Sequence, residues 1–166
     1  MRISILDEPE LEFASAGRHV DPRFGIVDYG PTDAGAPTAP SEIRVGIVGT
    51  ARDIDGLRGW FERCRSEIGR KPSHQPHLFP AFPGFNEDAA FRSTLVFDDR
   101  LEHTISQRDI EIAASAPTRQ AVEKTVELYR REIDALADER RCDVVVCARP
   151  DELHDEDAED GEPSEE

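Results

Sequence analysis

The residues best placed to bind a phosphate group follow a short apolar run. Residues 45–50, VGIVGT, lead into a segment with helical spacing, and the free N–H groups of a helix start attract anions. The run matches neither G-x-G-x-x-G nor G-x-x-x-x-G-K-[ST], because Gly46 falls within the expected strand. Asp53 and Asp55 would also repel phosphate. The pattern favours close packing of a strand on a helix, and a nucleotide site stays open as the alternative.

Two histidines have a spacing that is typical of metal ligands. His74 and His77, in HQPH, are three residues apart, and Cys64 or Asp88 could complete a zinc site. The pair lies in a proline-rich loop, however, and the sequence offers no second pair of ligands. Exposed loop histidines are therefore favoured over a zinc site.

Two further candidates for chemistry lie at the ends of expected strands. Asp98 and Asp99 are paired acids that could bind a metal ion, but neighbouring strand residues point to opposite faces, which favours a solvated turn. Cys147 has no histidine close by in the sequence except His154, so a buried structural thiol is favoured over a nucleophile. We expect no enzyme activity and no cofactor. No catalytic, cofactor-binding or metal-binding residue is assigned, and the nucleic-acid-binding residues stay unassigned.

The charge distribution separates the last residues from the rest of the chain. The 166-residue chain has a formal net charge of −16, and ten acidic residues without a Lys or Arg follow Pro150. Removing these ten from the 36 acidic residues leaves 26 against 20 basic residues, a net charge of −6. A mildly acidic body argues against nucleic-acid binding through bulk electrostatics and leaves room for a local basic pocket.

The cysteines and the apolar runs indicate a cytoplasmic protein. Cys64, Cys142 and Cys147 are odd in number and form no C-x-x-C pair, so reduced, buried thiols are expected rather than disulfides. The N-terminal residues lack the apolar run of a signal peptide, and no stretch approaches the roughly 18 apolar residues of a membrane span.

The two ends of the chain are predicted to lie outside the folded α/β domain. Residues 18–40 are rich in proline and glycine, which argues against a helix interior, so residues 1–40 are predicted to be an extended N-terminal segment. Within it, residues 2–6 and 11–13 could be short strands. Residues 151–166 combine high charge with few apolar residues and are predicted to be a disordered acidic tail.

Residues 41–150 are predicted to form one α/β domain. Short β-branched runs alternate with apolar stripes at helical spacing, and an order of strand, helix, strand, helix, strand predicts a Rossmann-like parallel sheet. The stripes predict burial of Trp60, and Val145 is expected to be buried in its strand. Thr50 or Asp53 can cap the first helix, and Gly69 can end it. The expected strands are 43–49, 91–97 and 142–148, the expected helices are 54–68 and 118–140, and residues 105–114 suit a strand or a helical turn equally well.

Several segments of the chain resemble the start of the short prokaryotic Argonautes, which are Piwi-type proteins made of MID and PIWI domains. The resemblance covers roughly residues 11–153, and the order and spacing of the segments carry it. The matching segments are 18–25 (RHVDPRFG), 28–31 (DYGP), 43–50 (IRVGIVGT), 78–85 (LFPAFPGF), 92–97 (RSTLVF) and 142–150 (CDVVVCARP).

The resemblance implies a Rossmann-like MID domain, which in that family holds the 5′ end of a guide nucleic acid. The family's pocket uses a Tyr or His, Lys and Gln cluster after the strand that here ends at Ala148. This chain has no Lys after Lys124 and no Tyr after Tyr129, so no pocket residue can be carried over. We therefore expect the entry segment and first half of a MID domain, truncated or split, without the guide 5′-phosphate pocket and without a PIWI domain.

The resemblance also implies partners and a role. The expected partners are the remaining MID–PIWI half, if it is encoded separately, and an effector subunit with a PIWI-associated domain, and guide nucleic acid would bind only the complete assembly. The implied role is non-catalytic, in guide-directed prokaryotic defence. Two alternatives stay open, a small nucleotide-binding α/β domain and a non-functional gene remnant.

Overall fold

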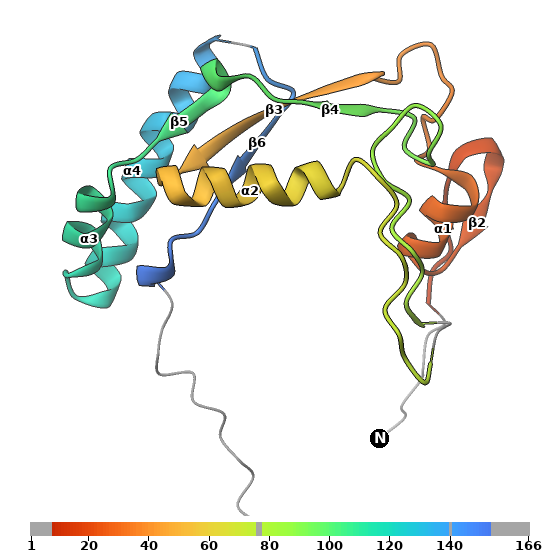
Figure 1. The fold of residues 1–166 in the computed structure, drawn as a ribbon, viewed down its shortest axis with the longest axis horizontal. Coiled ribbons are helices and arrows are strands. Elements are labelled where there is room, and N and C mark those ends of the chain that lie inside the picture. Colours follow the sequence, from red (N-terminus) through yellow and green to blue (C-terminus); the bar gives the residue numbers. More distant parts are fainter. Residues whose placement is uncertain (1–7, 76–77, 140, 154–166) are drawn as a thin grey trace, which may run out of the picture. The chain divides into compact units, whose positions relative to one another are not determined.

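The computed structural model describes residues 8–75, 78–139 and 141–153, and they form two compact units (Figure 1). Unit 1 contains residues 8–45 and 58–97, and unit 2 contains residues 46–57 and 98–153. Strand β3 (Glu42–Gly49) and helix α2 (Ala51–Arg63) each have residues in both units. The fold is mixed α/β with parallel strand pairs, as the alternation of strand and helix patterns predicts.

Unit 1 contains an antiparallel pair, β1 (Leu11–Glu12) with β2 (Arg18–His19), and a parallel pair, β3 with β4 (Thr94–Val96). In the parallel pair Glu42 lies opposite Thr94, and Arg44 lies opposite Val96. Strand β4 is thus shorter than the expected strand 91–97. The elements here are β1 (Leu11–Glu12), η1 (Ala14–Ala16), β2 (Arg18–His19), α1 (Pro22–Tyr29) and β4 (Thr94–Val96).

Residues 22–29 form helix α1, so the expected extended conformation is wrong at these positions. The Asp21 side chain caps the helix by accepting a hydrogen bond from the Arg23 backbone N–H at 2.9 Å. Pro22 occupies the first turn, where its missing N–H has no helical partner to lose. Gly30 ends the helix with a φ of 82°, in the region that glycine adopts without strain.

A glycine inside α1 serves packing rather than a turn. A Cβ atom at Gly25 would lie 2.2 Å from the ring of Phe13, which is itself 6 % exposed. The ring therefore packs directly on the helix backbone. Pro22 starts the helix, Gly25 permits the contact with Phe13, and Gly30 ends the helix. Only Pro22 and Gly30 therefore act as the chain-breaking signals that the sequence suggests.

Unit 2 is built on the second part of β3, which pairs in parallel with β5 (Glu102–Thr104) and also pairs with β6 (Val144–Cys147). Ile47 lies opposite Glu102, and the Ala148 backbone N–H donates to the Val48 carbonyl at 2.9 Å. Residues 107–114, within the ambiguous segment, form a helix. The elements here are η3 (Asp99–Leu101), β5 (Glu102–Thr104), α3 (Gln107–Ala114), α4 (Thr118–Glu139), β6 (Val144–Cys147) and η4 (Asp151–Leu153).

Helices α3 and α4 pack side by side in unit 2 and cover its core (Figure 1). Val145 is only half-buried where it packs against this core, although burial was expected. Burial of several aliphatic side chains at 0–4 % exposure stabilises the unit, each by about 1.5–3 kcal/mol. The buried core residues are Val48, Leu101, Ile105, Ile110 and Leu136.

The expected burial of Trp60 is wrong, because its side chain is 53 % exposed. Ile54 is buried at 3 % exposure, and at 100° per residue Trp60 lies about 120° around α2 from it. Phe61 lies only about 20° from Ile54 and is half-buried. The helix also ends at Arg63 rather than near Gly69, so it is shorter than its apolar stripe suggests.

Two expectations concern residues outside the described part of the chain. The expected strand at 2–6 and the disordered tail from residue 154 onward fall there. Of the acidic segment only residues 151–153 are described, and they form the 3-10 helix η4. Among the described residues, no helix has the length and apolarity needed to cross a membrane.

Candidate functional site

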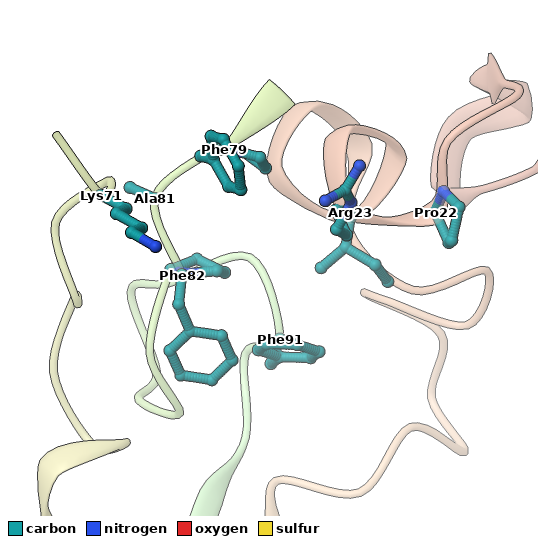
Figure 2. Close-up of a pocket in the computed structure, with 10 residues that line it drawn as sticks. Pro22, Arg23, Lys71, Phe79, Ala81, Phe82 and Phe91 are labelled. Atoms are coloured by element: carbon teal, nitrogen blue, oxygen red, sulfur yellow. The ribbon is translucent and has the colours of Figure 1, made fainter. Parts of the chain in front are cut away.

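An aromatic pocket in unit 1 is the strongest candidate for a binding site (Figure 2). Its volume is about 460 Å³, within the range that accepts small ligands. Figure 2 shows Arg23 and Lys71, from two different segments, near the rings of Phe82 and Phe91. We call it the aromatic pocket. Its lining residues are Pro22, Arg23 and Ile26 of α1, together with Lys71, Phe79, Pro80, Ala81, Phe82, Pro83 and Phe91.

Arg23 is held in place by the residue that caps its own helix. Its Nε donates to Asp21 Oδ1 at 3.0 Å, and its Nη2 donates to Asp21 Oδ2 at 2.5 Å. These hydrogen bonds lower the pKa of Asp21 to about 2, so the carboxylate stays ionised at neutral pH. The remaining Nη1 donates to the Leu78 carbonyl at 3.1 Å, which ties α1 to the loop that forms the rest of the pocket.

The loop over residues 78–85 is fixed by backbone hydrogen bonds to the segment after α2. Ile68 and Phe82 exchange two N–H to carbonyl bonds, both of 2.9 Å, and the Phe85 N–H donates to the Cys64 carbonyl at 2.8 Å. Gly84 has a φ of 84°, and a Cβ atom there would lie 2.7 Å from the Ser66 carbonyl carbon. This close approach accounts for glycine at the turn of the loop.

Three phenyl rings form the aromatic side of this region. The rings of Phe85 and Phe91 stack with centroids 4.3 Å apart and an interplanar angle of 17°. Phe82 lies 5.8 Å from each of them, in tilted arrangements. Phe79 is 37 % exposed at the pocket, so one ring stays accessible while the others are held rigid by mutual packing.

The charge at the pocket comes mainly from Lys71. Its side chain is exposed, and it has no ion-pair partner among the described residues. The charge of Arg23 is largely balanced by Asp21, but the planar face of its guanidinium group can still stack on a π-system. A rigid aromatic surface beside one unbalanced cation suits planar ligands that carry negative charge.

The turn after β3, the sequence candidate for phosphate binding, is occupied by side chains of its own helix. Thr50 Oγ1 donates to Asp53 Oδ2 at 2.7 Å and accepts from the Asp53 N–H at 3.3 Å. Thr50 is 4 % exposed, so this capping pair is largely shielded from solvent. The Asp53 carboxylate at the helix start disfavours a second anion there, in agreement with the preference for strand–helix packing at this turn.

The paired acids after β4 form a local cap. Asp98 accepts from the Arg100 N–H at 3.0 Å and pairs with the Arg100 side chain, with Nη2 to Oδ2 at 2.6 Å. The side-chain hydrogen bonds from Arg100 are the main cause that lowers the pKa of Asp98 to about 2. Asp99 is exposed and lies in η3. The solvated turn expected from the sequence is therefore what Asp98 and Asp99 form.

The histidine and cysteine candidates do not come together as a site within the described chain. His77 lies outside the described residues, and no group of three His, Cys, Asp or Glu side chains among the described ones could hold a metal ion. Cys64 is buried at 3 % exposure, as expected, and burial raises its pKa. Cys147 is exposed, so the expectation that it is buried is wrong. It ends the short strand β6, and partial desolvation of its thiol raises its pKa, which disfavours the nucleophilic thiolate.

Sequence reasoning assigned no binding residue, and it missed the pairing of Arg23 with the loop 78–85. One signal was present, since the aromatic run LFPAFPGF follows Lys71, one of two lysines in the chain. Helix α1 gives no such signal in the sequence, because the proline and glycine residues around Pro22 favour an extended segment. The protein-family models contain no match to this chain, and no curated protein matches it.

Proposed function

We propose that this chain is a non-catalytic, Argonaute-type component of guide-directed prokaryotic defence, acting in the cytoplasm. Residues 41–150 are the Rossmann-like part of its MID domain. The observation that carries the proposal is the aromatic pocket, where Lys71 and Arg23 lie beside phenyl rings. The pocket provides a contact for single-stranded nucleic acid.

The chemistry of the pocket supports this assignment. Proteins that hold single strands combine cations that follow the backbone with aromatic rings on which bases stack. Phe79 offers an exposed ring, and Lys71 offers a charge that no described residue neutralises. Stacking on one ring contributes about 1–3 kcal/mol per base and tolerates any sequence, because every base has a π-face.

Two segments of the Argonaute resemblance lie together at the aromatic pocket, which supports the proposal. Residues 18–25 and 78–85 are the first and fourth segments of the Argonaute resemblance. They are more than fifty residues apart in the chain, yet the hydrogen bond from Arg23 to the Leu78 carbonyl joins them at the pocket. A shared binding site accounts for both segments at once.

The chain is expected to work as part of a larger assembly. Strand β6 is followed by Arg149 and Pro150 and then by the acidic residues 151–153, which would repel the charged 5′ end of a guide, so a site for that end is not expected here. If the remaining MID–PIWI half is encoded separately, it supplies that site, and an effector subunit with a PIWI-associated domain supplies the response.

One observation favours a second candidate function, a small nucleotide-binding α/β domain. A pocket of about 460 Å³ has room for a single nucleotide, and a base on the rings with a phosphate near Lys71 would satisfy the same chemistry. Binding of free mononucleotides as tight as binding of oligonucleotides supports this second candidate against the first.

The proposal is tested by fluorescence anisotropy with labelled single-stranded DNA and RNA. We expect weak binding that decreases as salt is added, because Lys71 releases counterions from the phosphate backbone. Phe79→Leu removes the ring but keeps an apolar side chain, and it should lower the affinity about tenfold. Lys71→Gln should lower the affinity and reduce its salt dependence.

The chain offers matched controls for both substitutions. Lys124→Gln removes the other lysine, which lies on α4 in unit 2, and should leave the affinity unchanged. Trp60→Leu removes an exposed aromatic ring that does not line the pocket. If the control variants lose as much affinity for the oligonucleotides as the pocket variants do, the aromatic pocket is not the contact site.

A further inference from the structure

Helix α4 has an apolar stripe that its own unit covers only in part. Leu136 is fully buried, and Tyr129 and Ile133 are partly buried against the core of unit 2. Val122 and Val126 belong to the same stripe but are 55 % and 58 % exposed. Two valines adjacent on one helix face form a patch rather than scattered exposure.

A groove of about 430 Å³ lies beside Val126 in the same unit. Its walls are almost entirely apolar. The Tyr129 hydroxyl donates to the Ala148 carbonyl, so α4 and the end of β6 are fixed relative to each other along the groove. The principal lining residues are Val126, Tyr129 and Ile133 on one side and Cys147, Ala148 and Pro150 on the other.

The spacing of the stripe is that of a helix that packs on another helix. The positions 122, 126, 129, 133 and 136 alternate steps of four and three residues, which is the heptad pattern of knobs-into-holes packing. Two such helices in antiparallel orientation, related by a two-fold axis between positions 127 and 128, bring Val122 opposite Ile133 of the second copy. The same axis brings Val126 opposite Tyr129 of the second copy.

This arrangement is complementary to itself. The exposed Val122 and Val126 of each copy meet the groove beside Tyr129 and Ile133 of the other, so each copy supplies both the protruding and the receiving surface. An isologous interface requires this reciprocity.

The charges along the stripe fit the same partner. Glu123 follows the stripe position Val122, and Arg130 follows the stripe position Tyr129. In an antiparallel pair of helices, Glu123 of one copy faces Arg130 of the other. Each two-fold pair would therefore form two Glu–Arg contacts. Arg130 now lies 3.9 Å from Glu127 and 3.8 Å from Asp134, in exposed pairs that contribute little and can be exchanged at small cost.

We propose that the chain forms a two-fold symmetric dimer through antiparallel packing of α4 against α4 of a second copy. A single helix seam is a small interface, and the net charge of −16 on each copy opposes association. The dissociation constant is therefore expected in the micromolar range, a free energy of roughly −8 kcal/mol. The inference concerns unit 2 alone and goes beyond the nucleic-acid proposal, which concerns the aromatic pocket.

The test is sedimentation equilibrium of the full chain over a range of concentrations, without nucleic acid. The wild-type chain should show a monomer–dimer equilibrium, and Val126→Glu should weaken it about a hundredfold by placing a charge in the seam. Val27→Glu, at a 40 % exposed valine of α1 in unit 1, is the control and should leave the equilibrium unchanged. Circular dichroism confirms that each variant is folded.

Charge reversal gives a second test, in which the apolar residues between the two α4 helices stay unchanged. Arg130→Glu sets the introduced glutamate against Glu123, and Glu123→Arg sets the introduced arginine against Arg130, so each variant alone should dimerise about tenfold more weakly. The double variant should restore the wild-type affinity. An equimolar mixture of the two single variants should form heterodimers, because each supplies the charge that the other lacks.

Three results would overturn the proposal. A wild-type chain that stays monomeric at the highest attainable concentration shows that no second copy binds this face and leaves it to another partner. A dimer that persists in Val126→Glu shows that copies associate through another surface. Failure of both the double variant and the mixture to recover association shows that α4 does not pack antiparallel in this register.

Discussion

Thr125 and Thr50 are two buried threonines of unit 2 for which the same substitution should have opposite effects on stability. Thr125 is 6 % exposed, and its hydroxyl has no hydrogen-bond partner among the described residues. Thr50 is 4 % exposed, and its hydroxyl caps α2 through Asp53. Thr→Val keeps the shape of the side chain and removes only the hydroxyl group.

The expected magnitudes follow from what each hydroxyl does. An unpaired buried hydroxyl costs about 1–3 kcal/mol, part of which Thr125→Val recovers, so we expect a gain in the free energy of unfolding of about 1 kcal/mol. Thr50→Val removes a helix cap and leaves Asp53 without its partner, so we expect a loss of about 1–2 kcal/mol. Thr125→Ser keeps the hydroxyl and loses a methyl group, and it should destabilise by about 1 kcal/mol.

Urea unfolding monitored by circular dichroism, at concentrations below those of self-association, measures the three differences. Midpoints should shift in opposite directions for Thr125→Val and Thr50→Val, with an unchanged slope. If Thr125→Val is as destabilising as Thr50→Val, the Thr125 hydroxyl has a partner in solution, and the packing described around α4 is wrong.

Three further predictions concern other parts of the chain. Gly25→Ala should destabilise by about 1–3 kcal/mol in thermal unfolding despite the higher helix propensity of alanine, because the added methyl group collides with Phe13; unchanged stability would contradict that contact. Asp98→Asn should be less stable than wild type above about pH 4, because Arg100 lowers the pKa of Asp98 to about 2. That difference should vanish as the pH of the unfolding experiment falls through about 2, and a pH-independent difference would refute it. Cys147 should react with iodoacetamide at a rate that still rises above about pH 8.5, because its pKa is raised; a plateau below that pH would contradict this.

The regular elements were predictable where the local pattern and the tertiary environment agree. The β-branched run at 43–49 forms β3, because a strand buried in a parallel sheet needs apolar residues on both faces. Helix α4 begins at Thr118, directly after Pro117, and its length matches the apolar stripe. In both elements, every local signal indicates the same structure.

Prediction failed where one residue type has two physical uses. Glycine at position 25 and proline at position 22 read as chain breakers, yet one permits contact with Phe13 and the other starts α1. Trp60 is apolar and correctly spaced from Leu57, but it points away from the line that Ile54 and Phe61 define. Composition and spacing alone do not specify which neighbour a helix face will meet.

The aromatic pocket could not be predicted as a site because its walls come from segments far apart in the sequence. The rings of Phe79 and Phe82 were visible as an aromatic run, and Lys71 lies close to them in the chain. The hydrogen bond from Arg23 to the Leu78 carbonyl places α1 at the pocket. A single tertiary contact of this kind produces no periodic pattern in the sequence from which it could be predicted.

The proposed function makes its most direct prediction about the 5′ end of the guide. In fluorescence anisotropy, the isolated chain should bind 5′-phosphorylated and 5′-hydroxyl oligonucleotides equally weakly, because Lys71 and the phenyl rings recognise any stretch of single strand. Phosphate-dependent binding should arise only when a MID–PIWI half that provides the 5′-phosphate pocket is added. Tight binding by the isolated chain that requires the 5′ phosphate would contradict the account, because it would show that this chain already contains a complete guide pocket.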